Sequence, residues 1–271
     1  MRIKSGLAGF LLTCMISCNL GESSQTDTLS LTMNANSELM TTEIQMDTIT
    51  VNNISFTMIH VEGDTFTMGA TPEMLEPFDN EKPAHLVTLG NYCIGQTEVT
   101  QELWQAVMGE NPSKTKGDKL PVEEISWDDI QQFLSSLNTL TGMKFRMPTE
   151  AEWEFAARGG KLSQHYQYAG SNNAEEVAWY DTKQTNPVGQ KEPNELGIYD
   201  MSGNVWEWCL DWYDENYYQN VEINPQGPES GIYCVLRGGS WGGSEKYCRC
   251  SCRAGYSPDL RDIDCGFRLA Y

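Results

Sequence analysis

Glycine and aromatic residues are scattered along most of this chain, and their distribution constrains the fold more than any other feature. The 24 Gly, 8 Trp and 12 Tyr residues fall among short elements and many turns, and no repeat of fixed length is visible. Such a sequence predicts an irregular α+β domain. The length of 271 residues allows one large domain or two small ones, and 39 % hydrophobic residues are enough for a packed core.

Capping residues mark three helices in the sequence. Thr100, Ser126 and Thr149 stand where a hydroxyl can cap the start of a helix. Gly109 and Gly142 stand where glycine ends one. Helices are therefore expected at 99–108, 126–142 and 149–159, and short strands at 65–68, 85–89, 92–96, 234–237 and 266–269.

The N-terminus has the features of an export signal. Basic residues precede a short apolar segment at 6–16, and Ser17 places a small residue directly before Cys18. This pattern resembles a bacterial lipoprotein signal over residues 1–17, with lipidation of Cys18 as a membrane anchor. We therefore expect a location in the cell envelope, facing the periplasm or at the cell surface. An ordinary secretory signal is the alternative.

The segment after Cys18 is polar and acidic. Residues 19–53 are rich in Ser, Thr and Asn and contain five acidic and no basic residues. This composition predicts a flexible acidic spacer over 18–52, followed by the folded domain at 53–271. Alternating apolar residues at 43–46 and 48–51 also fit a first edge strand.

The whole chain is strongly acidic. Its 18 basic and 38 acidic residues give a net charge of −20. A surface with this charge repels phosphate backbones, so no nucleic-acid partner is expected. The excess of carboxylates favours a divalent cation as a ligand, and a solvated acidic surface is the alternative.

Six motifs resemble those of the sulfatase-modifying-factor family, whose founding activity is formylglycine generation. The resemblance covers residues 55–271 in the family's order. It implies a single α+β domain, poor in secondary structure and related to the C-type lectin fold. The motifs are Phe66-Thr67-Met68-Gly69, Glu98-Val99-Thr100, 146–154 (RMPTEAEWE), 203–208 (GNVWEW), 237–241 (RGGSW) and 266–269 (GFRL).

The resemblance also implies a reactive pair of cysteines that this chain lacks. Formylglycine generators of the family carry two cysteines, five positions apart, that bind copper, and the copper activates oxygen to oxidise a substrate cysteine. The second position is Cys248, but the first is Gly243. Because glycine cannot ligate copper, the pair is broken. The family's substrate cleft corresponds here to Ser240, Trp206 and the Gly243 position.

Two neighbouring cysteines offer a replacement for the missing thiol. Cys250 and Cys252 follow Cys248 at a spacing that puts three thiols on one face of an extended segment. A soft-metal site with Cys248 as the catalytic residue is therefore one interpretation. Packed thiols are another, and disulfides are a third because export permits them. Seven cysteines follow Cys18, so at least one cannot pair within the chain.

The segment from Asp200 to Glu207 predicts a calcium site. It has a carboxylate at each end and turn-forming residues between them. The two carboxylates and backbone carbonyls of such a turn can converge on a hard cation. The family resemblance implies a calcium here, held by the side chains of Asp200 and Glu207 and the backbone oxygens of Gly203 and Val205. Carboxylates that only cap a turn are the alternative.

Other chemical residues are expected to be structural. Three histidines, His60, His85 and His165, stand alone in the sequence without ligand spacing. Five arginines stand among acidic and aromatic residues, which predicts buried ion pairs. They are Arg146, Arg158, Arg249, Arg253 and Arg268.

Three functions follow from these features. The missing thiol at Gly243 favours a non-catalytic binding or accessory protein, tethered to a membrane, whose cleft takes a protein, peptide or glycan partner. The first alternative is a copper-dependent formylglycine-generating oxidoreductase that acts on sulfatase cysteines. The second is a ligand-binding variable protein of a diversity-generating retroelement, which this chain resembles in its closing motifs. In that case the stretch between Trp241 and Cys265 forms the binding surface.

Overall fold

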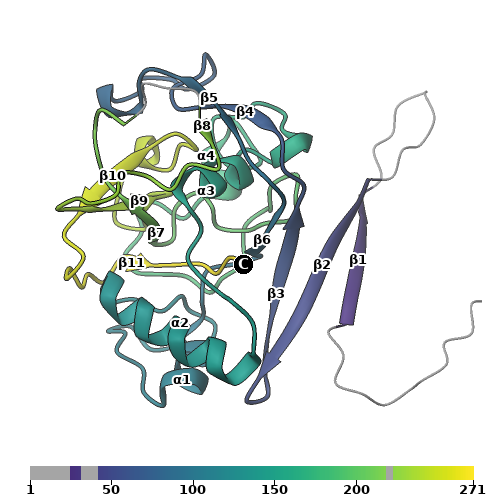
Figure 1. The fold of residues 1–271 in the computed structure, drawn as a ribbon. Helices are drawn as coiled ribbons and strands as arrows, with labels where there is room; N and C mark the ends of the chain where they lie inside the picture. The colour runs from purple at the N-terminus through teal and green to yellow at the C-terminus, as the bar shows by residue number, and fades with distance from the viewer. Residues whose placement is uncertain (1–24, 32–41, 218–221) are drawn as a thin grey trace, which may run out of the picture.

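The computed structural model describes residues 25–31, 42–217 and 222–271, and its elements are mostly short (Figure 1). The strands are β1 (Gln25–Leu31), β2 (Thr42–Val51), β3 (Ile54–Val61), β4 (Thr65–Met68), β5 (His85–Thr88), β6 (Tyr92–Gly95), β7 (Trp206–Trp212), β8 (Glu222–Ile223), β9 (Cys234–Arg237), β10 (Arg253–Tyr256) and β11 (Cys265–Gly266). The α-helices are α1 (Gln101–Met108), α2 (Trp127–Thr141), α3 (Glu150–Ala157) and α4 (Ala174–Val177). Short 3₁₀ turns lie at Asp79–Glu81, Gly160–Leu162 and Glu245–Tyr247.

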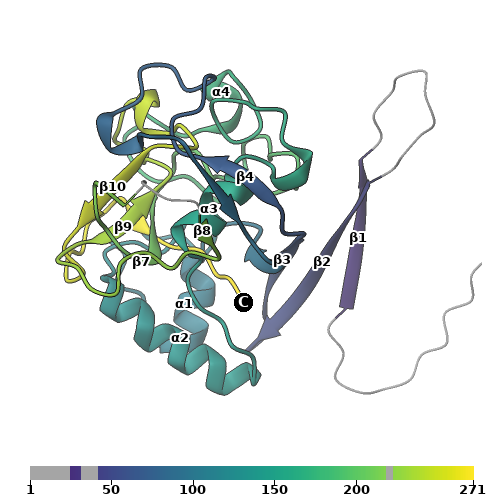
Figure 2. The same ribbon diagram turned by 45° about the horizontal axis from the view of Figure 1, so that its top comes forward.

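The strands form three small sheets. Their orders are β1-β2-β3-β6, β10-β9-β7-β11 and β4-β5-β8. Helix α1 packs against α2 and β3, and α3 packs between β4 and the pair β7 and β9 (Figure 2). This mixture of short strands, helices and long connections confirms the irregular α+β class.

The folded domain begins earlier than the sequence predicts. β2 pairs with β3 in an antiparallel hairpin, whose turn is Asn52-Asn53 with φ of 48° and 68°, a conformation that Asn tolerates. The expected boundary at 53 falls inside this turn, so residues 42–52 belong to the domain and not to a spacer. The alternative of a strand is correct, but β2 is an inner strand between β1 and β3 and not an edge. Its four buried apolar side chains are Ile44, Met46, Ile49 and Val51.

The three predicted helices are present with the predicted caps. The Thr100 hydroxyl accepts a hydrogen bond from the backbone of α1, and Ser126 and Thr149 form capping boxes on α2 and α3. Gly109 and Gly142 end α1 and α2 in the left-handed conformation. Within the described ranges, none of the helices is both long and apolar enough to span a bilayer.

Four of the five predicted strands match closely, and the last is shorter. β11 covers two residues where 266–269 was expected. After Gly266 the chain leaves β7 and runs beside β6, where the Gly95 amide donates to the Leu269 carbonyl and the Cys93 amide to that of Tyr271. The C-terminal residues thus close over the first sheet.

Buried ion pairs connect loops to the core, as the positions of the five arginines in the sequence predict. A buried charge without its partner is strongly destabilising, so each pair fixes the segment that carries it. Arg146 pairs with Glu152 at the edge of the core at 2.6 Å. The other four predicted arginines form buried pairs, which are Arg158–Glu154 at 2.8 Å, Arg249–Glu81 at 2.5 Å, Arg253–Glu150 at 2.7 Å and Arg268–Glu207 at 2.6 Å. Arg237 forms a further buried pair with Glu154 at 2.5 Å.

The cysteines of the described residues are all buried free thiols. They are Cys93, Cys209, Cys234, Cys248, Cys250, Cys252 and Cys265. The disulfide alternative is therefore not adopted in this structure.

Candidate functional site

The residues expected in the substrate cleft come together beside β9 and β10. An open cleft of about 860 Å³ is lined by Trp206, Ser240 and Gly243. We call it the aromatic cleft. Its further lining residues are at 78–80, 213, 215, 233, 241–242, 247, 252–256 and 262–264.

A glycine turn holds Ser240 against an acid. Gly238 and Gly239 have φ of 91° and 75°, and a Cβ on Gly239 would lie 2.8 Å from the Tyr247 carbonyl carbon. Glycine alone fits this turn without strain. The Ser240 hydroxyl donates to Asp264 Oδ2 at 2.6 Å, and burial raises the pKa of the Asp264 carboxyl.

Aromatic rings form much of the cleft surface. Trp206 meets Tyr247 edge-on with ring centroids 6.2 Å apart, and Phe78 stacks on the same tyrosine at 5.6 Å. Tyr233 and Tyr256 are about half exposed. Exposed rings of this kind offer flat apolar faces with polar edges, which suit peptide and sugar ligands.

The charge in the cleft is mainly negative. Its Arg253 guanidinium is held by Glu150, with Nε 2.7 Å from the carboxylate oxygen, so this cation is already compensated. The cleft therefore favours positively charged or hydrogen-bonding ligands. The acidic lining residues are Asp79, Glu215, Asp262 and Asp264.

The residues present do not fit a copper ion held by two thiolates. Gly243 supplies no ligand, and Cys248 does not line the cleft. The Cys248 side chain is fully buried and packs in a cluster with Tyr168 and Val177. Burial also raises the pKa of its thiol.

The predicted alignment of three thiols is not observed. The chain at Cys248 to Cys252 is turned rather than extended, and β10 begins only at residue 253. The buried Arg237 guanidinium draws the segment inward by donating to the carbonyls of Cys250, Ser251 and Cys252. Burial raises the pKa of Cys250 and of Cys252 to about 12.

The calcium motif brings Asp200 together with an acid that the sequence analysis did not include. Asp200 Oδ2 accepts from the Gly189 amide at 2.6 Å, and Glu98 Oε1 accepts from the Asn204 side chain at 3.0 Å. The second oxygen of each carboxylate, Asp200 Oδ1 and Glu98 Oε2, is buried without a hydrogen-bond partner. Burial raises the pKa of Asp200 to about 6, and burial with the charge of Asp200 raises that of Glu98.

Two unpartnered, buried carboxylate oxygens fit a hard cation, since native structures seldom leave such atoms unsatisfied. The other expected ligands are arranged differently. Both oxygens of Glu207 accept from Arg268 at 2.6 Å, and Oε2 also accepts from Trp153 at 2.7 Å. Gly203 and Val205 are buried. The calcium site remains a prediction, with Glu98 added to its donors.

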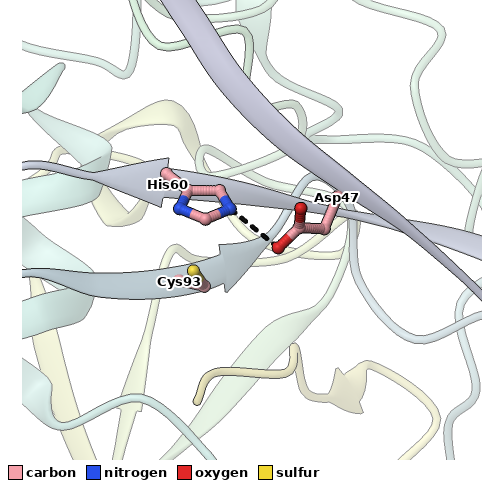
Figure 3. Close-up of side chains that lie close together, drawn as sticks. All are labelled: Asp47, His60 and Cys93. Atoms are coloured by element: carbon pink, nitrogen blue, oxygen red, sulfur yellow. Dashed lines mark hydrogen bonds and ion pairs between the residues drawn. The ribbon is translucent and has the colours of Figure 1, made fainter. Parts of the chain in front are cut away.

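His60 is not isolated, contrary to the sequence prediction. Its imidazole lies 2.7 Å from Asp47, and Cys93 lies close to both (Figure 3). The three residues are far apart in the sequence and do not have the spacing of a metal-binding motif. The sequence alone therefore does not indicate that they form a cluster. They come together because β2, β3 and β6 are neighbours in one sheet.

The structure is an irregular α+β domain whose glycine turn adjoins an aromatic cleft. Comparison with known proteins identifies the family of this domain. The model of the sulfatase-modifying factor enzyme 1-like domain matches residues 46–271. The chain therefore belongs to the sulfatase-modifying-factor family, as its motifs predict.

Curated relatives of the chain have diverse names. It is 36 % identical over 208 residues to chaperone protein LppX of Paenibacillus barcinonensis, covering 57 % of this chain and 71 % of that one. It is 33 % identical over 190 residues to the formylglycine-generating enzyme of Streptomyces coelicolor, covering 62 % and 57 %. It is 29 % identical over 257 residues to serine/threonine-protein kinase Pkn1 of Chlamydia trachomatis, covering 84 % and 40 %. The chain thus spans less than two thirds of the last two relatives.

Solved structures share the fold. Treponema denticola variable protein 1 matches with a TM-score of 0.77 and 34 % identity, covering 83 % of this chain and 98 % of that one. PvdO from Pseudomonas aeruginosa matches with a TM-score of 0.69 and 26 % identity, covering 79 % and 93 %. The formylglycine-generating-enzyme-like fold predicted from the motifs is confirmed.

Proposed function

We propose that this protein is an exported, membrane-tethered member of its family that binds a ligand in the aromatic cleft without catalysing oxidation. The observation that carries the proposal is the state of the reactive pair. Gly243 lines the cleft without a thiol, and the Cys248 sulfur is buried outside it. The cleft still has its glycine turn and its aromatic lining. It therefore offers a binding surface although it lacks the pair of thiols that oxidation requires.

The ligand is a protein, peptide or glycan of the cell envelope. Aromatic rings bind sugar and proline-like faces by stacking, and the acidic lining attracts cationic groups. The names of two relatives, a chaperone and a variable protein, support roles for this fold that are not oxidation.

Blocking the cleft tests this proposal. A Cβ on Gly242 would meet no atom within 4 Å, so Gly242→Trp adds a bulky side chain to the cleft lining at a position that has room for its Cβ. The matched control is Gly90→Trp, a glycine outside the cleft whose Cβ would make only an ordinary contact, 3.6 Å from Asn224 Oδ1. Panels of oligosaccharides and cationic peptides are titrated while fluorescence of the cleft tryptophans is recorded.

We expect ligands of the wild-type protein to bind the Gly90→Trp variant and to be lost from the Gly242→Trp variant, at unchanged melting temperatures. Equal binding by both variants would remove the cleft as the site.

The membrane tether rests on Cys18, which lies outside the described residues. Cys18→Ser prevents lipidation, and we expect it to move the protein from the membrane fraction to the soluble fraction, since the acyl chains are the anchor. Immunoblots of fractionated cells check this. Persistence in the membrane fraction would contradict a lipid anchor at this residue.

A diversified binding surface is the second candidate, and the composition of the cleft favours it. Much of the cleft lining falls between Trp241 and Cys265, the stretch in which a variable protein would differ. Sequencing of the surrounding DNA tests it. For this candidate we expect a second, almost identical copy of this coding segment close by in the DNA, with differences at adenines. If no such copy exists, the cleft is not diversified and this candidate is rejected.

A further inference from the structure

Three chemically reactive side chains share one face of the first sheet. His60 on β3 lies directly opposite Cys93 on β6. Asp47 on β2 is paired with Met58, two residues before His60, so it points to the same face. The sheet therefore gathers a carboxylate, an imidazole and a thiol from three neighbouring strands (Figure 3).

The donor atoms of these side chains are close enough to share one ion. One atom from each residue lies within 4.8 Å of the other two, and His60 Nε2 is 2.7 Å from Asp47 Oδ2. Ligands bound tetrahedrally to zinc lie about 3.4 Å apart. Small side-chain rotations therefore bring the cluster to zinc geometry, and the strand pairing need not change.

A hydrogen bond from Tyr271 supports the cluster, and a pocket lies next to it. The Tyr271 hydroxyl donates to Asp47 Oδ2 at 2.6 Å, which orients the carboxylate as an outer partner does in metal sites. His60, Cys93 and Tyr271 line a pocket of about 540 Å³. Glu62 and Lys161, paired at 2.5 Å, lie on its wall.

We propose that Asp47, His60 and Cys93 form a zinc(II) site that is separate from the aromatic cleft. Sulfur, nitrogen and oxygen ligands together suit a borderline ion, whereas calcium and magnesium select oxygen alone. Cys93 binds as the thiolate and releases its proton to solvent. Three protein ligands leave the fourth position open toward the pocket, where water or a small anionic ligand completes the coordination.

Cobalt(II) alone is the sharpest probe, because it takes zinc sites and reports its ligands by colour. The full chain is freed of metal with a chelator and titrated with cobalt(II), and zinc(II) alone is titrated by calorimetry. We expect one zinc per chain, a near-ultraviolet thiolate-to-cobalt charge-transfer band, and a higher melting temperature with zinc, because the ion joins three strands.

Variants decide which residues bind the metal. Cys93→Ser and His60→Gln should lower zinc affinity about 100-fold or more, since loss of even an outer partner costs 10–100-fold. Cys93→Ser should also abolish the thiolate band. The matched control is Cys234→Ser, a buried thiol on β9, which should keep both the affinity and the band.

Circular dichroism and melting curves without metal show that each variant is folded. An absent thiolate band in the wild-type protein would overturn the proposal, and so would a band that survives Cys93→Ser. Equal zinc affinity of the folded His60→Gln variant would overturn it as well.

Discussion

At the scale of single residues, the lack of a thiol at Gly243 is not imposed by the backbone. A Cβ there would lie 3.4 Å from Tyr247 Cδ2, an ordinary contact. Gly239, four residues earlier, has φ of 75°, and its Cβ would crowd the Tyr247 backbone at 2.8 Å. The glycine of the turn is required, while the glycine of the broken pair is not.

Substitution at these two glycines should separate their roles. We expect Gly243→Cys to change the free energy of unfolding by less than about 1 kcal/mol. Gly239→Ala should cost about 1–3 kcal/mol because alanine is strained at positive φ. Urea denaturation measures both, and a larger loss for Gly243→Cys would contradict the geometry.

The raised pKa of Asp200 predicts an unusual pH dependence in the presence of chelator. Its pKa is about 6 in the folded chain and 3.8 in a model compound. The folded state therefore binds more protons between these values, and the stabilisation by protonated Asp200 is lost as pH rises from about 4 to above 6. Asp200→Asn should flatten this slope. Urea denaturation across this pH range checks it, and an unchanged slope would contradict the assignment.

Calcium should oppose this effect if the pair of carboxylates binds it. A ligand bound only to the folded state stabilises it by mass action, so adding calcium at pH 7 should raise the melting temperature and chelation should lower it. Glu98→Gln should reduce the calcium shift. A melting temperature that is indifferent to chelator would remove the site.

At the scale of elements, the hairpin of β2 and β3 decides where the domain begins. A chain starting at residue 53 loses four buried apolar side chains of β2, each worth about 1.5–3 kcal/mol. That loss is comparable to the whole stability of a domain, about 5–15 kcal/mol. We expect chains from residue 42 to fold and chains from residue 53 not to, by circular dichroism. A cooperative melt of the shorter chain would contradict this boundary.

Elements with local signals were the ones that the sequence predicted. Thr100, Ser126 and Thr149 specify their helices through hydrogen bonds within a few residues, so they can be read without tertiary structure. β7 is different, because its two acidic residues, Glu207 and Asp211, are buried among apolar and aromatic residues and the strand lacks a clear alternation. Its strand conformation depends on β9 and β11, which are distant in sequence.

The candidate sites show the same division. Trp206, Ser240 and Gly243 were predicted from family motifs, and they line one cleft. Glu98 belongs to another of those motifs, but only the fold brings it to Asp200. The residues around His60 form no recognisable ligand motif in the sequence, because they come from three separate strands.

In the molecule as a whole, the fold buries most arginine charges in ion pairs, while the chain has a large excess of acidic residues. Arginines are largely used in buried pairs with glutamates, and the chain as a whole carries a net charge of −20. The resulting acidic surface disfavours nucleic acid and anionic partners. We therefore expect the aromatic cleft to prefer uncharged or cationic groups.

We propose for this family member a cleft that binds a ligand and does not oxidise it. The most direct measurement is an aerobic assay of the folded protein with copper and reductant on a peptide with a sulfatase-type cysteine, read by mass spectrometry. We expect no aldehyde, because the cleft holds no pair of thiolates. Formation of aldehyde by the wild-type chain would contradict it and make the protein an enzyme.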